Sequence, residues 1–100
     1  MTVLEELIVY HKDNMWRHSR SITMYSDYLF YIEKNIYDLY NSIGYRRSDI
    51  KFEVYLLPSV NYDTDTNVVV QPLNDLTEKL FSLTELEFTR IAKINSIYVD

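Results

Sequence analysis

Apolar and amphipathic side chains recur at alternating intervals of three and four residues over the first 43 positions of the chain. Because this spacing places side chains on one side of a helix, it predicts a helical first half whose stripe packs against a partner element. No proline interrupts the stripe, and the chain's only glycine, Gly44, follows its last member. The stripe consists of Met1, Leu4, Ile8, His11, Met15, His18, Ile22, Tyr25, Leu29, Ile32, Ile36, Leu39 and Ile43.

The start of this helical region is marked by Thr2 and Glu5, which have the spacing of a capping box. In such a box each side chain hydrogen-bonds a free backbone N–H of the other residue, so a helix is predicted to begin at Val3. A single helix from there to Ile43 would be about 60 Å long. A compact domain of this mass does not cover that length, so one long helix would require a partner chain.

A break within the stripe is favoured by weak helix formers between positions 13 and 23. They are Asp13, Asn14, His18, Ser19, Ser21 and Thr23. We therefore expect two antiparallel helices, over residues 3 to about 18 and about 22 to 43, with one continuous coiled-coil helix as the alternative. Gly44 supplies the left-handed residue that commonly ends a helix.

After the glycine the hydrophobic period changes to two. Alternate residues from Phe52 to Leu56 are apolar, which is typical of a half-buried strand, and Pro58 ends this run. Residues 67–71 are rich in valine and read as a second strand, while residues 61–66 are polar. The region is therefore predicted to form an antiparallel hairpin with a connection longer than a tight turn.

The helical period returns near residue 74, where Asn74 or Asp75 is predicted to cap a helix. Thr84 and Glu87 repeat the capping-box spacing, so a short break before them should divide this region into two helices. Residues 97–99 have high strand propensity and are expected to form a β-prone tail that adds a strand.

The length of 100 residues, 47% of them hydrophobic, suits a single domain over residues 1–100. The patterns predict an α+β fold with two N-terminal helices or one long helix, a small antiparallel β-hairpin, a C-terminal helix and a short β-prone tail. The chain has no cysteine, and its start is acidic where a signal peptide would be basic. No apolar run approaches the roughly 18 residues that span a bilayer. We expect a cytoplasmic protein with no membrane partner.

The histidines and one acidic loop are candidates for metal binding. His11 and His18, seven residues apart on one helix, would lie about 10 Å apart along its axis. Nitrogen ligands lie about 2 Å from a zinc ion, so the pair cannot share one ion unaided. The run from Asp63 has the spacing of a calcium loop, but its sixth position is Val68 and its twelfth is Asn74, where glycine and glutamate are required. We predict no metal and no cofactor.

Two basic clusters lie in a chain whose net charge is −5. Cations with interleaved aromatics suit a single-stranded nucleic acid, through phosphate neutralisation and base stacking. They equally suit protein recognition, in which Arg, Trp and Tyr are favoured anchors, and they also occur as solvated charge. The first cluster contains His11, Lys12, Trp16, Arg17, His18 and Arg20, and the second contains Arg46 and Arg47.

The chain also has ten tyrosines, several of them on the second predicted helix. They form either an adhesive face or ordinary packing at the boundary of the core. Phe30 and Tyr37, with Tyr31 and Tyr40 nearby, make a second stripe, so this helix is covered on more than one side or keeps one face for a partner. The residues predicted to bind a partner are Trp16, Arg17, Arg20, Tyr28, Tyr31, Tyr37, Arg46 and Arg47.

No nucleophile–base pair, phosphate-binding loop or dinucleotide motif is recognisable, and one glycine cannot build a glycine-rich loop. We therefore predict a non-enzymatic protein–protein interaction module, assembled as a homodimer through the helical stripe. Residues with AT-rich codons, such as the ten tyrosines, outnumber residues with GC-rich codons, such as the single glycine. This bias favours a phage or mobile-element inhibitor that occludes a surface of a host or defence (CRISPR-type) protein in the host cytoplasm. The alternative is a nucleic-acid-binding accessory protein that uses the basic-aromatic clusters at 11–20 and 45–47.

Overall fold

The computed structural model of the chain describes residues 1–15, 22–57 and 67–99. Helices precede and follow a two-stranded hairpin, as the sequence patterns predicted, and the α+β class is confirmed. The elements are α1 (Val3–Met15), α2 (Ile22–Asn41), the 3-10 helix η1 (Arg47–Asp49), β1 (Phe52–Leu57), β2 (Asn67–Pro72), α3 (Asp75–Phe81) and α4 (Glu85–Val99).

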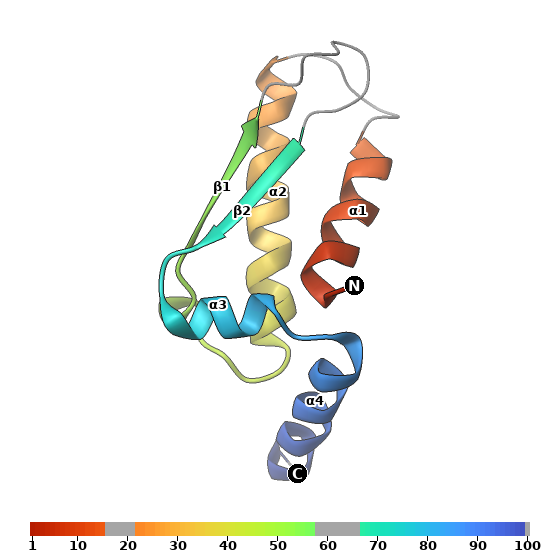
Figure 1. Ribbon diagram of the computed structural model, residues 1–100, viewed down its shortest axis with the longest axis vertical. Helices are drawn as coiled ribbons and strands as arrows, with labels where there is room; N and C mark the ends of the chain where they lie inside the picture. Colours follow the sequence, from red (N-terminus) through yellow and green to blue (C-terminus); the bar gives the residue numbers. More distant parts are fainter. Residues whose placement is uncertain (16–21, 58–66, 100) are drawn as a thin grey trace.

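The central element is α2, and the others are arranged around it (Figure 1). α1 runs beside α2 in the opposite direction, so the described parts form the predicted antiparallel helix pair. The break expected between the two helices lies at residues 16–21, outside the described residues. The hairpin crosses α2, α3 lies near its C-terminal end, and α4 projects from that end of a molecule measuring 48 × 25 × 23 Å.

The core is built on the inward face of α2. Tyr28, Ile32, Ile36 and Tyr40 follow one another every fourth residue, and the last three are 0% exposed. The predicted stripe contained the two isoleucines but neither tyrosine, because it assumed strict alternation of three-residue and four-residue steps. An ideal α-helix has 3.6 residues per turn, so a row of four-residue steps also stays on one face over three turns. The other buried hydrophobic residues are Leu4, Ile43, Ile50, Leu80 and Phe81.

Both predicted capping boxes are present. The Glu5 N–H donates to Thr2 Oγ1 at 3.1 Å, and the Thr2 N–H donates to Glu5 Oε1 at 3.3 Å. The box of Thr84 and Glu87 has the corresponding pair of bonds, at 3.3 and 3.2 Å. In each box the threonine hydroxyl donates to the carboxylate, and this bond, followed by the backbone bond, lowers the pKa of Glu5 and Glu87.

The predicted hairpin is also present, and α3 holds it in place. β1 and β2 pair antiparallel along their full length, with Phe52 opposite Pro72. The hydroxyl of Thr77, a residue that is 0% exposed, accepts a hydrogen bond from the Lys51 N–H at 2.9 Å, immediately before β1. Asn74 caps α3, as predicted, by accepting a bond from the Thr77 N–H at 2.8 Å.

Two helix ends differ from the sequence-based expectation. α2 ends at Asn41, and a turn through Gly44, with φ of 101°, follows it. Residues 97–99 belong to α4, so the expected β-prone tail is wrong. Extending an existing helix adds one hydrogen bond for each residue fixed, whereas a strand needs a neighbour with which to pair. The strand propensity of these three residues is therefore overridden by the helix that precedes them.

An isolated β-bridge between Thr2 and Thr84 joins the beginnings of α1 and α4. The Val3 N–H donates to the Leu83 carbonyl at 3.1 Å beside this bridge. The N-terminal ends of two helices far apart in the sequence are therefore fixed next to each other.

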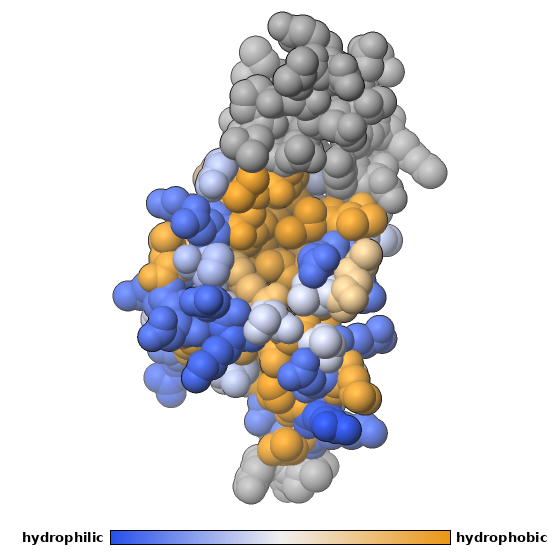
Figure 2. Space-filling view, in the orientation of Figure 1, coloured by the Kyte–Doolittle hydropathy of each residue, from blue (hydrophilic) through white to orange (hydrophobic). Residues whose placement is uncertain are grey.

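Within the described residues, no helix is both long and apolar enough to cross a membrane. On the face shown in Figure 2, apolar surface gathers between the hairpin and α1, and hydrophilic side chains cover much of the region of α3.

Candidate interaction surface

The outward face of α2 presents exposed aromatic and charged side chains, whereas its inner face is buried. Phe30 is 73% exposed and Tyr31 is 49% exposed, although Tyr28 and Ile32 of the same helix are buried. A large aromatic side chain left in water forgoes the stabilisation that burial would give it, so an exposed phenylalanine on a rigid helix is a candidate binding residue. Lys34, one turn after Phe30, is exposed on the same side of the helix.

Arg47 of η1 reaches back to this face of α2. Its guanidinium carbon lies 4.3 Å from the centroid of the Tyr37 ring, within the range of a cation–π interaction. The Tyr37 ring in turn packs on Phe52 at 4.9 Å between centroids. Phe52 packs on Phe81 of α3 at 5.6 Å, so ring contacts connect the surface arginine to the core. These contacts give Arg47 a firm support.

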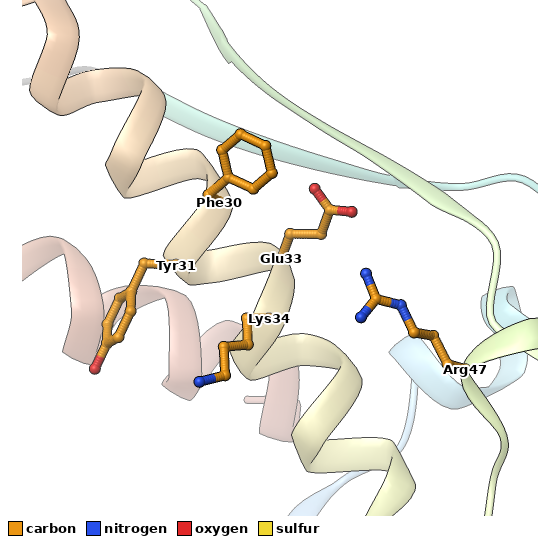
Figure 3. Close-up of a pocket in the computed structure, with 5 residues that line it drawn as sticks. All are labelled: Phe30, Tyr31, Glu33, Lys34 and Arg47. Atoms are coloured by element: carbon orange, nitrogen blue, oxygen red, sulfur yellow. The ribbon is translucent and has the colours of Figure 1, made fainter.

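An open depression of about 420 Å³ lies at this surface. Figure 3 shows Glu33 and Arg47 directed toward each other, while the side chains of Tyr31 and Lys34 point away from Arg47. We refer to the five lining residues as the α2 patch. They are Phe30, Tyr31, Glu33, Lys34 and Arg47.

The charge of the α2 patch is opposite in sign to that of the whole chain. Two cations and one carboxylate line it, which gives a net charge of +1 in a chain of net charge −5. Arg46, the exposed residue before Arg47, adds a further positive charge nearby. An aromatic centre with arginine beside it has the composition of a protein-binding hot spot.

The residues predicted to bind a partner fall into three groups. Tyr31 and Arg47 line the α2 patch, Tyr37 lies beneath Arg47, and Arg46 is exposed beside it. Tyr28 is only 5% exposed and belongs to the core, so it does not share this surface. The remaining three, Trp16, Arg17 and Arg20, lie outside the described residues.

Three members of the α2 patch are absent from the predicted set: Phe30, Glu33 and Lys34. A signal for Phe30 was available, because it lies on the side of the helix opposite Ile32 and Ile36. The sequence contains no corresponding indication that Arg47 would approach α2, since this contact depends on how the chain turns back after Gly44.

The described residues were compared with the metal-site predictions made from the sequence. They contain no group of three or more His, Cys, Asp and Glu side chains that could hold a metal ion. The side chains of His11 and His18 and the acidic loop at residues 63–66 lie outside the described part, so those predictions are untested. Burial raises the pKa of the Tyr40 hydroxyl above its ordinary value, but this group is enclosed in the core.

A second open depression, also about 420 Å³, lies along α3 and lacks aromatic lining residues. Its lining consists of Asp75, Glu78, Lys79 and Ser82. Of these two depressions, the α2 patch is therefore the better candidate for recognition. Comparison with known proteins gave no family model, curated protein or solved structure that matches the chain.

Proposed function

We propose that this chain is a non-enzymatic protein-binding module that acts by covering a surface of another protein with its α2 patch. The observation that carries the proposal is Phe30, 73% exposed on the central helix beside Lys34 and Arg47. Burial of such a ring in a partner's pocket would recover its hydrophobic stabilisation. The neighbouring cations would select the partner by charge, and the ring contacts beneath Arg47 limit the entropy lost on binding.

The specific form of this proposal is an inhibitor that a phage or mobile element directs against a host or defence (CRISPR-type) protein in the host cytoplasm. The codon bias inferred from composition supports this origin. The absence of a recognisable catalytic motif from the sequence favours occlusion over chemistry. The homodimer predicted from the helical stripe stays a prediction, and sedimentation of the full chain at several concentrations checks it.

The test is capture of a target from extracts of the natural host with the full chain as bait. A protein retained by the wild-type chain is identified by mass spectrometry, purified and titrated. We expect Phe30→Ser and Arg47→Glu each to weaken its binding about tenfold or more, as central interface residues do. Leu86→Ser is the matched control, because Leu86 is 64% exposed but lies on α4, away from the patch. Equal binding by all variants would refute the use of this surface.

Nucleic-acid binding is the second candidate function, supported by Arg46 and Arg47 and by the exposed aromatic residues that line the depression with Arg47. It predicts affinity for single-stranded oligonucleotides that falls steeply with salt. Charge reversal at both arginines would then weaken binding to all sequences alike. Oligonucleotide affinity that is insensitive to these changes would refute this alternative.

A further inference from the structure

The outer edge of β1 carries backbone groups that β2 does not use. The Leu73 N–H donates to the Lys51 carbonyl at 2.8 Å, which shows which residues bond across the hairpin. Because bonded and non-bonded pairs alternate in an antiparallel ladder, the odd-numbered residues of β1 bond to β2. Phe52, Val54 and Leu56 therefore turn their N–H and C=O groups outward. In the described part of the chain, no backbone group outside the hairpin pairs with these positions.

The two edges of the hairpin are not equivalent. The outer edge of β2 includes Pro72, which has no N–H to offer a further strand. Its position opposite Phe52, a non-bonded pair, agrees with the alternation along the ladder. In Figure 1 the edge of β2 also faces the side on which α1 lies, whereas the edge of β1 faces away from α1. The edge of β1 is therefore the better place for another strand.

This edge runs along the α2 patch. The contact of Tyr37 with Phe52 fixes the start of β1 against α2, and Arg47 lies over the same tyrosine. Figure 3 shows β1 passing the side of α2 from which Phe30 and Glu33 project. A strand added to β1 would lie about 4.8 Å beyond it. Its inward side chains would then cover the depression, and with it the exposed ring of Phe30.

We propose that the outer edge of β1 binds an extended acidic segment of a partner protein, which pairs as a third strand and places alternate side chains on the α2 patch. This rests on the proposed function and specifies the form of its partner. Phe30 precedes Tyr37 by seven residues, about 10 Å along the helix axis. Same-side residues of a strand recur about every 6.7 Å, so an apolar side chain over Phe30 and a carboxylate near Arg47 are two or four residues apart.

The charges favour a different protein over a second copy of this chain. The α2 patch has a net charge of +1, and Arg46 lies beside it. If two copies paired antiparallel through β1, their α2 helices would lie on the same face of the joined sheet. The two patches would then face each other. Like charges would then meet at the interface, whereas an acidic segment gains attraction from the same cations.

The probe for this proposal is a displayed library of random linear twelve-residue peptides, selected against the full wild-type chain. The tightest peptide is synthesised, and amide hydrogen exchange of the chain is measured by NMR with and without it. We expect exchange at the amides of Phe52, Val54 and Leu56 to slow about tenfold or more on binding, because each gains a partner. N-methylation of the alternate peptide amides that face β1 should abolish this protection, because it removes the donors to the β1 carbonyls and so prevents the peptide from pairing as a strand.

Charge selection is tested with the same peptide. Arg47→Glu should weaken its binding about tenfold, while Lys79→Glu on α3, which makes the same change outside the patch, should leave it unaltered. Failure to select any peptide, or a peptide that binds without protecting the three amides, overturns strand addition. If these amides are protected in the free chain, and the protection increases with chain concentration, a second copy pairs with the edge of β1. That result would also overturn the proposal. The proposed function fails separately, if Phe30→Ser leaves binding of the captured target unchanged.

Discussion

Replacing Tyr40 with phenylalanine should stabilise the protein. Tyr40 is 0% exposed, and among the described residues its hydroxyl has no hydrogen-bond partner. A buried polar group that finds no partner costs about 1–3 kcal/mol. The ring contacts with Phe81 at 5.7 Å and Phe88 at 6.4 Å do not involve the hydroxyl, so the variant retains them. We expect a gain near the lower end of that range, because the vacated space forgoes some dispersion.

Urea unfolding followed by circular dichroism measures this gain at pH 7. In thermal unfolding, a gain of about 1 kcal/mol corresponds to a melting temperature that is about 4–8 °C higher for a domain of this size. Tyr55→Phe is the control, because it removes a hydroxyl from a tyrosine that is 38% exposed. A loss of stability in Tyr40→Phe larger than that of the control would refute the reasoning, since it would mean that the hydroxyl has a favourable interaction in the folded protein.

Alkaline pH provides a second measurement on the same variant. Burial raises the folded-state pKa of Tyr40 above its unfolded value, so the folded protein prefers the neutral hydroxyl. The contribution of this preference to stability is full below about pH 10 and is lost as the pH rises from there through the folded-state pKa. Wild type should therefore lose up to about 1.4 kcal/mol per pH unit more than Tyr40→Phe above pH 10. Parallel pH profiles would contradict this expectation.

Three further changes test the fold elsewhere. Thr77→Val should cost about 1–3 kcal/mol in urea unfolding, because the Lys51 N–H loses its acceptor, while Thr77→Ser should retain most of the stability. Gly44→Ala should cost about 1–2 kcal/mol in the same assay. The residue has φ of 101°, and its new Cβ would lie 2.7 Å from the side-chain nitrogen of Asn95. The Thr84 bonds lower the folded-state pKa of Glu87, so their contribution is present above its unfolded pKa and is lost as the pH falls through the folded-state value. Stability profiles from pH 7 to pH 3 should therefore be flatter for Glu87→Gln than for wild type, and coincident profiles would exclude this contribution.

The local elements were predictable because their signals are local. Each capping box needs two residues three positions apart, and alternation within six residues was enough to identify β1. The tail failed for the same reason, since propensity within residues 97–99 contains no information about the helix that reaches them. Tyr40 shows the limit for the core, because an amphipathic side chain fits both a second surface stripe and the interior.

The candidate surface was only partly predictable, because it is assembled from segments that meet through tertiary structure. Arg47 and Tyr37 were both in the predicted set, yet nothing local indicated that one lies over the other. Phe30 was recognised as part of a second stripe, but its exposure depends on which elements cover α2. Alignment of the edge of β1 with the α2 patch is a property of the hairpin's position and has no counterpart in the sequence pattern.

The bridge between Thr2 and Thr84 has a consequence for the order of folding. Closing a loop of about 80 residues costs about 4 kcal/mol of chain entropy beyond a constant, so this contact is unfavourable while the intervening chain is open. Prior formation of the hairpin and α3 shortens that loop and reduces the entropic cost. The bridge that anchors the start of α4 to the start of α1 should therefore form late, after α1 has docked on α2.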